Sequence, residues 1–192
     1  MLSGNQLIST IKSLPDADIK QVVKTCGYTS IQKNGTEKLN FTDFSWIKTS
    51  KFIELDTIDV SEDPVRPELD LSWRTSHDRK IYGLEYNKQI EGIMCLAFTK
   101  DVPHSVRELD LMSRLAVYEQ NADTIIAYTV WSRKKGAGKK IMEEALKFGK
   151  EMGYKRIVTL SPLTPMATHY HIRNGAKLLG HNPTTQNFEY SL

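Results

Sequence analysis

Two glycines, Gly136 and Gly138, stand in a short basic stretch that reads Arg-Lys-Lys-Gly-Ala-Gly-Lys over residues 133–139. Because glycine carries no side chain, the backbone N–H groups around it can approach an anion closely. A helix that begins near Lys139 would add the positive end of its dipole at this position. The stretch therefore predicts a cradle for a phosphate or pyrophosphate group. The alternative is a tight connection between a strand and a helix that binds nothing.

The flanking residues predict a strand before this loop, and a helix and a second strand after it. Residues 123–131 are rich in β-branched and aromatic side chains, which is typical of a buried strand. Apolar residues then recur at helical spacing as far as Gly153, which is placed to end the helix. The expected buried face of this helix consists of Ile141, Ala145, Phe148, Gly149 and Met152. Residues 156–161 predict a second apolar strand that ends at Pro162, and the connection between the two strands indicates a parallel pair.

The loop fits the pattern Arg/Gln-x-x-Gly-x-Gly/Ala, and in this it resembles the acyl-CoA loop of the GNAT acetyltransferase superfamily. Many members of that superfamily have an Ala, a Tyr and a Gly at intervals of four residues in a later helix. In this chain the same frame holds Ala167, His171 and Gly175, so that a His stands in the place of the Tyr.

A second resemblance follows from that replacement. The motif Ser161-Pro162, followed by His-Tyr-His at residues 169–171 and Asn-Gly-Ala at residues 174–176, is similar to the catalytic domain of malonyl-CoA decarboxylase, a relative of the acetyltransferases. In that family a Ser and a His of these motifs are catalytic. Residues 92–105 extend the likeness upstream, so that it covers about residues 80–190. The decarboxylases are much longer, with a large helical region and a longer phosphate loop. In its short loop this chain is nearer to the acetyltransferase pattern.

These resemblances imply that acyl-CoA is bound as a substrate and that no metal takes part. They assign the catalytic role to His171 and Ser161. The residues that they assign to acyl-CoA binding are Val130, Trp131, Arg133, Lys134, Lys135, Gly136, Ala137, Gly138 and Lys139. A neutral imidazole can donate or accept a proton near neutral pH. His171 could therefore protonate a departing CoA thiolate in acyl transfer, or hydrogen-bond a thioester oxygen in decarboxylation.

Other polar residues near these motifs have less defined roles. Ser161 could bind a substrate carboxylate or position an acyl carbonyl, and the alternative is a Ser that caps the next helix. His169 is two residues from the predicted catalytic His, so we expect it to point elsewhere on the helix, with a surface or supporting role. Glu85, Glu91 and His104 are candidate bases for an amine acceptor, and nothing in the sequence selects among them.

Composition favours a cytoplasmic enzyme with one core. The chain has 192 residues, of which 40% are hydrophobic and 26% charged, enough for one good core and a small second module. No apolar run approaches a membrane span, and the first residues lack the cationic start of a signal peptide. Cys26 and Cys95 are expected to stay reduced, and neither lies near a Cys or His cluster of the kind that binds structural zinc.

Charge is unevenly distributed along the chain. The net charge is +3, but residues 133–156 carry nine Lys or Arg against three Glu, a balance of +6. This suits the polyanionic nucleotide end of coenzyme A, although a solvated helix face would have the same composition. Residues 54–70 show the opposite bias, with seven acidic side chains, two prolines and one cation, Arg66. We expect this acidic stretch to be a linker or a surface excursion.

The expected fold class is α/β (α+β), a mixed sheet flanked by helices, with an antiparallel front half and a parallel centre. Residues 1–44 resemble a segment of cyanobacterial AbrB-like regulators, and two helices and a hairpin are predicted there. The predicted parts of the chain are a small N-terminal module at 1–48, an acidic linker with the first strand region at 49–78, and a GNAT-like acyl-CoA-binding domain at 79–192.

Three hypotheses for function remain open at this point. The first is an acyl-CoA-dependent acyltransferase, specifically an N-acetyltransferase. The sequence does not identify its amine or protein acceptor. The second is a compact enzyme similar to malonyl-CoA decarboxylase. The third is a regulatory protein that keeps the fold without catalysis and binds DNA or a protein through residues 1–48. No membrane partner is expected.

Overall fold

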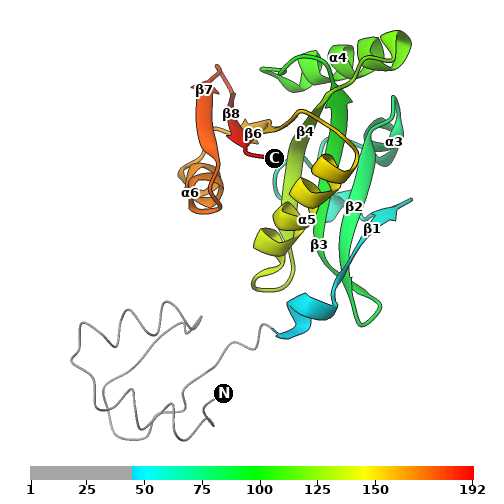
Figure 1. Ribbon diagram of the computed structural model, residues 1–192, viewed down its shortest axis with the longest axis vertical. Helices are drawn as coiled ribbons and strands as arrows, with labels where there is room; N and C mark the ends of the chain where they lie inside the picture. The colour runs from blue at the N-terminus through cyan, green and yellow to red at the C-terminus, as the bar shows by residue number, and fades with distance from the viewer. Residues whose placement is uncertain (1–44) are drawn as a thin grey trace, which may run out of the picture. The chain divides into compact units, whose positions relative to one another are not determined.

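An eight-stranded mixed sheet forms the centre of the computed structural model, which describes residues 45–192 (Figure 1). Its strands are β1 (Lys51–Leu55), β2 (Lys80–Tyr86), β3 (Gln89–Thr99), β4 (Thr124–Ser132), β5 (Arg156–Thr159), β6 (Ser161–Pro162), β7 (Lys177–His181) and β8 (Thr185–Tyr190). They lie in the order β1-β2-β3-β4-β5-β8-β6, with β7 paired to β8. β4 and β5 run parallel and the other pairs are antiparallel, which confirms the predicted class.

Helices cover both faces of this sheet. They are η1 (Ser45–Thr49), η2 (Val60–Glu62), α3 (Leu71–Thr75), α4 (Val106–Glu119), α5 (Ala137–Glu151) and α6 (Pro165–Arg173). Ile141 and Ala145 of α5 belong to one apolar core with Leu84 and Met94. Leu109 of α4 belongs to a second core on the other face, with Leu71 and Trp73 of α3 packed against it. The sheet is therefore buried between two helical layers.

The predicted strand, loop, helix and strand are present as β4, α5 and β5. α5 begins after Gly136, whose φ of +91° is a conformation that glycine adopts without strain. Gly149 lets the helix lie close to the sheet, because a Cβ there would come within 2.9 Å of Ile157 Cδ1. The prediction that Met152 is buried is wrong, since its side chain is 62% exposed. α5 ends at Glu151, so Met152 is the cap residue and not part of the buried face.

The hairpin of β2 and β3 brings the sheet against the start of α5. Its turn residues Asn87 and Lys88 both have positive φ, of 50° and 63°. Glu91 is an extra residue between two pairs of the ladder, which places a bulge beside Gly92 as predicted. A Cβ at Gly92 would lie 3.3 Å from Ala137 Cβ, so this glycine allows close approach of β3 to the loop that precedes α5.

The parallel pair of β4 and β5 opens into a fork. The first four residues of β4 pair with β5, and the last hydrogen bond runs from the N–H of Leu160 to the carbonyl of Ala127, at 3.0 Å. Beyond this bond Ser161 and Pro162 form β6 and pair with β8, while β4 continues beside β3. The predicted single strand over residues 156–161 is therefore wrong at its end, because β8 takes over the pairing after Leu160.

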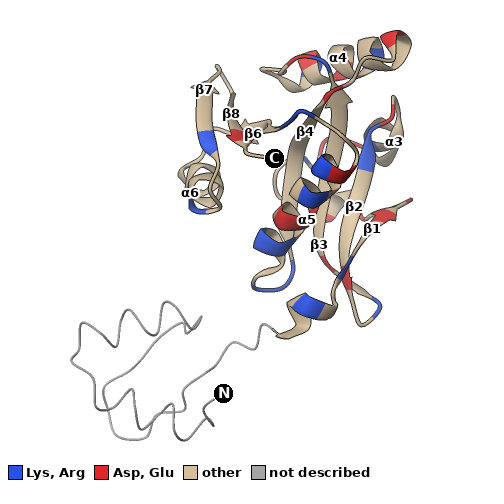
Figure 2. Ribbon diagram, in the orientation of Figure 1, with Lys and Arg blue, Asp and Glu red and all other residues tan. Residues whose placement is uncertain are grey.

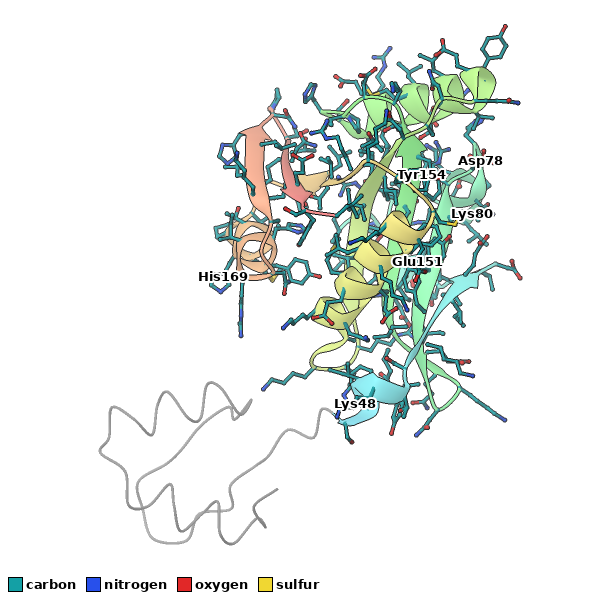
Figure 3. The ribbon with its side chains drawn as sticks, viewed as in Figure 1. Lys48, Asp78, Lys80, Glu151, Tyr154 and His169 are labelled. Carbon is teal, nitrogen blue, oxygen red and sulfur yellow. The ribbon has the colours of Figure 1, made fainter. Side chains whose placement is uncertain are left out.

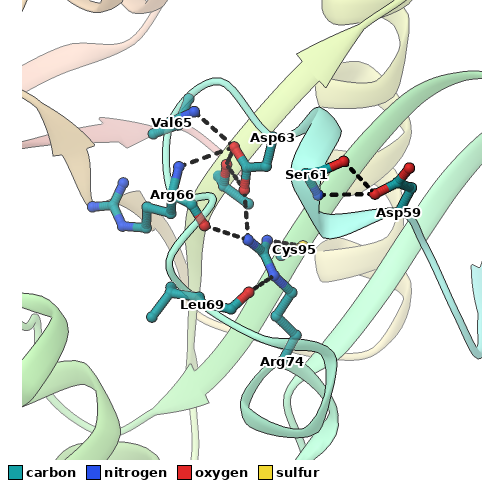
Figure 4. A network of polar contacts seen from close by, with 9 residues as sticks. Asp59, Ser61, Asp63, Val65, Arg66, Leu69, Arg74 and Cys95 are labelled. Atoms are coloured by element: carbon teal, nitrogen blue, oxygen red, sulfur yellow. Dashed lines mark hydrogen bonds and ion pairs between the residues drawn. The ribbon is translucent and has the colours of Figure 1, made fainter.

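The acidic stretch lies mostly at the surface and is anchored in the protein through Asp63, because six of its seven acidic residues are exposed and Asp63 is buried. Asp63 is 1% exposed and forms an ion pair of 2.8 Å with Arg74, itself buried. The Asp63 carboxylate also accepts hydrogen bonds from the backbone N–H groups of Val65 and Arg66 and from the hydroxyl of Thr129 on β4 (Figure 4). Because these donors neutralise the carboxylate, an acidic residue is stable here without solvent.

The predictions for residues 1–44, namely two helices, a hairpin and the AbrB-like segment, lie outside the described residues. Residues 46–192 form one unit. Cys95 lies in β3 and is buried with a free thiol. Within residues 45–192, each helix is too short or too polar to cross a lipid bilayer.

We expect Asp63→Asn to lower the free energy of unfolding by about 3 kcal/mol, because it leaves the Arg74 guanidinium buried without a counter-charge. Urea denaturation checks this. Asp59→Asn is the control, since Asp59 is an exposed carboxylate in the same stretch that accepts hydrogen bonds from Ser61. Its expected cost is much smaller, because solvent screens an exposed carboxylate. Equal effects of the two substitutions would contradict the interpretation that Asp63 anchors this stretch.

Candidate active site

Ser161 and His171, ten residues apart in the sequence, meet where the fork opens. Ser161 Oγ lies 2.7 Å from His171 Nε2, and the two side chains are buried, at 5% and 4% exposure. α6 sets this geometry. It is capped by Thr164, has Pro165 in its first turn and ends before Gly175, whose φ is +89°. The Ala167, His171 and Gly175 frame predicted from sequence therefore places the His on the side of α6 that faces Ser161.

Hydroxyl groups bracket the imidazole on both sides. His171 Nδ1 lies 2.9 Å from the hydroxyl of Tyr190, and Ser161 Oγ lies 3.0 Å from Thr159 Oγ1. The His171 ring also stacks on Phe188, with 4.9 Å between ring centroids. The result is a buried chain of polar groups from Tyr190 through His171 and Ser161 to Thr159.

Burial lowers the pKa of His171 to about 4, so the ring is neutral at pH 7. A neutral imidazole has one N–H donor and one acceptor nitrogen, and the hydroxyls of Ser161 and Tyr190 can serve as either. Burial raises the pKa of Tyr190, which keeps that hydroxyl protonated. A proton can consequently move from Tyr190 towards Ser161, or back, without leaving a charge on the ring.

A cavity of about 420 Å³ occupies the fork beside this chain. One wall is the free part of β4 and the start of α5, and the other wall is β6 with α6. The lining residues are Pro64, Val65, Ala127, Tyr128, Thr129, Val130, Trp131, Ser132, Gly138, Met142, Ser161, Pro162, Thr164, Met166, Ala167, Tyr170 and His171. Val130, Trp131 and Gly138, predicted to bind acyl-CoA, are among them. None of the lining side chains is Lys, Arg, Asp or Glu, so the cavity suits an apolar or amide-containing chain.

Free backbone donors stand at the start of α5. The N–H of Ala137 bonds to Lys134 O and that of Lys140 bonds to Gly136 O. Between them, the N–H groups of Gly138 and Lys139 find no acceptor in the described part of the chain, and no side chain caps the helix. Free N–H groups at a helix N-terminus are what an anion cradle requires, and anion binding at this loop stays a prediction. The hydroxyl of Tyr170 donates to the Gly138 carbonyl at 2.6 Å, and so ties α6 to the start of α5.

The basic residues around the loop are mostly engaged with other groups. Arg133 pairs with Glu62 and donates to the carbonyl of Ile90 at 3.0 Å. Lys134 lies over the rings of Trp46 and Tyr86, at 4.7 and 4.5 Å from their centroids. Along α5, Lys and Glu alternate on the surface (Figure 2) and pair as Lys139–Glu143, Lys140–Glu144 and Lys147–Glu151. An anion at this loop would therefore be held more by backbone N–H groups than by the predicted excess of positive charge.

The remaining sequence candidates lie away from the cavity. His169 is exposed on α6 and its side chain points outward (Figure 3), as predicted. Glu85, Glu91 and His104 do not line the cavity. His104 instead pairs with Glu108 at the start of α4, at 3.3 Å.

Sequence reasoning missed several residues of the site. Thr159 and Tyr190 extend the polar chain, and Tyr170 closes one side of the cavity. Pro64 and Val65 add a wall from the acidic stretch, and they precede Ser161 by 97 and 96 residues. The single signal that pointed to this stretch was Arg66, the one cation among seven acidic residues.

No known protein family and no curated protein matches this chain. Among solved structures, a malonyl-CoA decarboxylase from Agrobacterium vitis is similar over 77% of this chain and 62% of its own, with a TM-score of 0.62 and 14% identity. The decarboxylase from Rhodopseudomonas palustris matches over 76% of this chain and 61% of its own, with a TM-score of 0.59 and 15% identity. A Bacillus subtilis acetyltransferase in complex with CoA matches over 74% of this chain and 99% of its own, with a TM-score of 0.55 and 10% identity.

These likenesses show the fold. It is a GNAT-like fold, similar to those of the acetyltransferase and the malonyl-CoA decarboxylases, and in this chain it is a mixed sheet with a forked parallel pair. This confirms the fold resemblance read from the sequence. The chain spans about three fifths of the two decarboxylase chains.

Acid should destabilise the protein through His171. Its folded pKa of about 4 lies below the ordinary value of 6.5, so its stabilising contribution is complete above pH 6.5 and is lost as the pH falls towards 4. Between pH 7 and pH 4 we expect the wild type to lose roughly 3 kcal/mol more than His171→Gln, which does not titrate. Urea unfolding at both pH values measures this, and His169→Gln should follow the wild type. Parallel curves for wild type and His171→Gln would show that His171 is not buried in its neutral form.

Gly138→Glu should abolish CoA binding, because its carboxylate would lie at the anion cradle. Gly138→Ala should fold and bind CoA nearly as well as the wild type, since a Cβ there meets Ser132 Oγ and Tyr170 Cε2 at an ordinary 3.5 Å. Isothermal titration with CoA compares the two. Unchanged affinity in Gly138→Glu would mean that the loop is only a connection.

Proposed function

We propose that this protein acts on an acyl-CoA thioester and that it decarboxylates a short acyl group bearing a carboxylate, as in malonyl-CoA. The observation that carries the proposal is the buried hydrogen bond between Ser161 and neutral His171 beside the cavity in the fork. The likeness to malonyl-CoA decarboxylases in fold, and in the motifs that contain these two residues, supports it.

Binding of the CoA portion follows from three features of the fork. The free N–H groups at the start of α5 suit the pyrophosphate. The edge of β4 beyond Ala127 has no partner from β5, so its backbone groups can hydrogen-bond the amides of an extended pantetheine arm. The uncharged cavity then takes the acyl end, next to Ser161 and His171. A solved structure of similar fold is a complex with CoA, which supports CoA as the ligand.

Decarboxylation needs little more than these groups. The bond between the carboxylate carbon and Cα breaks, CO₂ leaves, and the electron pair moves to the thioester carbonyl to form an enolate. Donors at the thioester oxygen, here the Ser161 hydroxyl or the N–H of His171, stabilise the negative charge as it develops there. One proton is then added to Cα. The chain of His171 and Ser161 can deliver that proton, and it is reprotonated from solvent after the product leaves.

Acyl transfer to an amine is the second candidate. It is favoured by the short loop and by the likeness to an acetyltransferase over nearly the whole of that chain. An ammonium group has a pKa of about 10.4 and must lose a proton before it attacks. Of the candidate bases Glu85, Glu91 and His104, none lines the cavity, and no lining carboxylate would hold a cationic acceptor. Decarboxylation requires no acceptor, which places it first.

The wild type should convert malonyl-CoA to acetyl-CoA and CO₂ without an added amine, as followed by mass spectrometry. His171→Ala should reduce turnover by about 10²-fold or more, because a proton-transfer group is lost, and should leave CoA affinity nearly intact. His169→Ala is the matched control from the exposed face of the same helix and should cost much less.

Two outcomes would contradict this proposal. If malonyl-CoA is stable at high protein concentration while acetyl-CoA is consumed only when an amine is added, acyl transfer is the function. If His169→Ala is the more damaging change, the assignment of His171 is wrong.

A further inference from the structure

Three hydrogen bonds join four buried groups at the candidate active site. Tyr190 Oη lies 2.9 Å from His171 Nδ1, and Ser161 Oγ lies 2.7 Å from His171 Nε2. Ser161 Oγ also lies 3.0 Å from Thr159 Oγ1. Each hydroxyl carries one proton, and the ring of His171, which burial keeps neutral at pH 7, carries one more. Four protons are therefore present for three hydrogen bonds, so one surplus proton has no acceptor inside this chain of groups.

The two ends of the chain of groups cannot place the surplus proton. Tyr190 and Thr159 are both buried, and neither lines the cavity. Within residues 45–192 the Tyr190 hydroxyl hydrogen-bonds only to His171. Thr159 Oγ1 has one further bond there, in which it accepts from the N–H of Phe188 at 3.2 Å. A surplus proton at either end would be buried without an acceptor, which is unfavourable.

Ser161 is the hydroxyl of this chain that lines the cavity. In the free protein it donates to Thr159, so the surplus proton stays on the Thr159 hydroxyl. An oxygen atom of a ligand beside Ser161 can accept the Ser161 proton instead, and the Thr159 hydroxyl can then donate to Ser161 Oγ. All four protons are used in that state. The site is thus one acceptor short, and a ligand oxygen at Ser161 supplies it.

A ligand can complete the hydrogen bonds in one of the two possible directions. If Tyr190 donates to Nδ1, the ring proton lies on Nε2 and is donated to Ser161, whose own proton is free for the ligand. In the reverse direction Nδ1–H donates to Tyr190, and Ser161 donates to Nε2. The surplus proton then stays on Tyr190, which does not line the cavity. The direction in which Tyr190 donates is therefore favoured.

We propose that Tyr190 is a positioning residue that holds His171 in the tautomer with its proton on Nε2, and thereby makes Ser161 the donor to the acyl oxygen of the substrate. This rests on the proposed binding of an acyl-CoA in the fork. A nucleophilic serine needs the opposite polarity, with an unprotonated ring nitrogen that accepts the serine proton. Ser161 therefore stabilises the enolate oxygen and forms no acyl-enzyme.

Nitrogen NMR of the protein with isotope-labelled histidine identifies the tautomer, because protonated and unprotonated ring nitrogens differ widely in chemical shift. His171→Gln assigns the His171 signals among the five histidines. At pH 7 the wild type should show Nε2 protonated and Nδ1 unprotonated. Tyr190→Phe removes the donor to Nδ1, so both tautomers should be populated and the shifts of the two nitrogens should approach each other. Tyr82→Phe, which removes a buried hydroxyl of β2 that does not line the cavity, should give the wild-type spectrum.

Isothermal titration tests the role of Ser161 without turnover. The two ligands are CoA and an analogue of acetyl-CoA in which an amide replaces the thioester, so that only the analogue has an acyl oxygen. Ser161→Ala should weaken binding of the analogue about ten-fold, the usual size of one lost hydrogen bond, and should leave CoA binding nearly unchanged. Ser132→Ala, which removes another hydroxyl that lines the cavity, should leave both affinities nearly unchanged.

Each result decides the proposal. A wild-type ring protonated on Nδ1, or a wild-type spectrum in Tyr190→Phe, would overturn the role of Tyr190. If that variant does not fold, the wild-type spectrum decides. An unchanged affinity for the analogue in Ser161→Ala, an equal loss of CoA binding, or covalent labelling of Ser161 by a fluorophosphonate would overturn the role of Ser161.

Turnover of malonyl-CoA is measured in parallel with these experiments. The expected tautomer and binding pattern without wild-type turnover would uphold the roles of Tyr190 and Ser161 and remove decarboxylation. Turnover by a wild type protonated on Nδ1 would remove the role of Tyr190 and leave decarboxylation in place.

Discussion

The hydrogen bond from Leu160 to Ala127 is the last link between β4 and β5, and the candidate site depends on the separation that follows it. β8 captures Ser161 and Pro162 on one side, and β3 retains β4 on the other. Two parallel strands that remain hydrogen-bonded along their length leave no space between them. Where the strands diverge into a fork, one strand edge becomes free and a cavity is enclosed. The same divergence positions Ser161 at the cavity and directs the chain into α6, which returns His171 to it. The same divergence of strands therefore both creates the cavity and brings Ser161 and His171 together.

Neutral polar groups dominate the inner part of the site. His171 lies between two hydroxyls and a phenyl ring, and within residues 45–192 no carboxylate contacts it to hold a proton on the ring. Such a group can pass a proton without accumulating charge, which suits chemistry in which a single proton is taken up at carbon.

The sequence predicted those parts of the structure that local pattern determines. The β4, loop, α5 and β5 unit followed from β-branched residues, helical spacing and Gly153, and the frame of His171 followed from a motif. Contacts between residues far apart in the sequence had no comparable sequence pattern that predicted them. Tyr190 reaches His171 through β8, whose position depends on the fork itself. Asp63 lies in a stretch whose composition indicates a solvated linker. The burial of the Asp63 side chain is explained only by its contacts with Arg74 and Thr129, which are distant in the sequence. The predicted burial of Met152 was wrong because the helix ends one residue earlier than its apolar spacing indicated.

The most direct test of the account is a crystal structure of the protein with the amide analogue of malonyl-CoA. The account predicts the pyrophosphate at the N–H groups of Gly138 and Lys139, the pantetheine arm along β4 beyond Ala127, and the acyl carbonyl oxygen within hydrogen-bond distance of Ser161 Oγ or His171 Nε2. A ligand bound outside the fork would contradict it. So would a ligand in the fork whose acyl group points away from Ser161 and His171, because the buried pair would then have no part in the reaction.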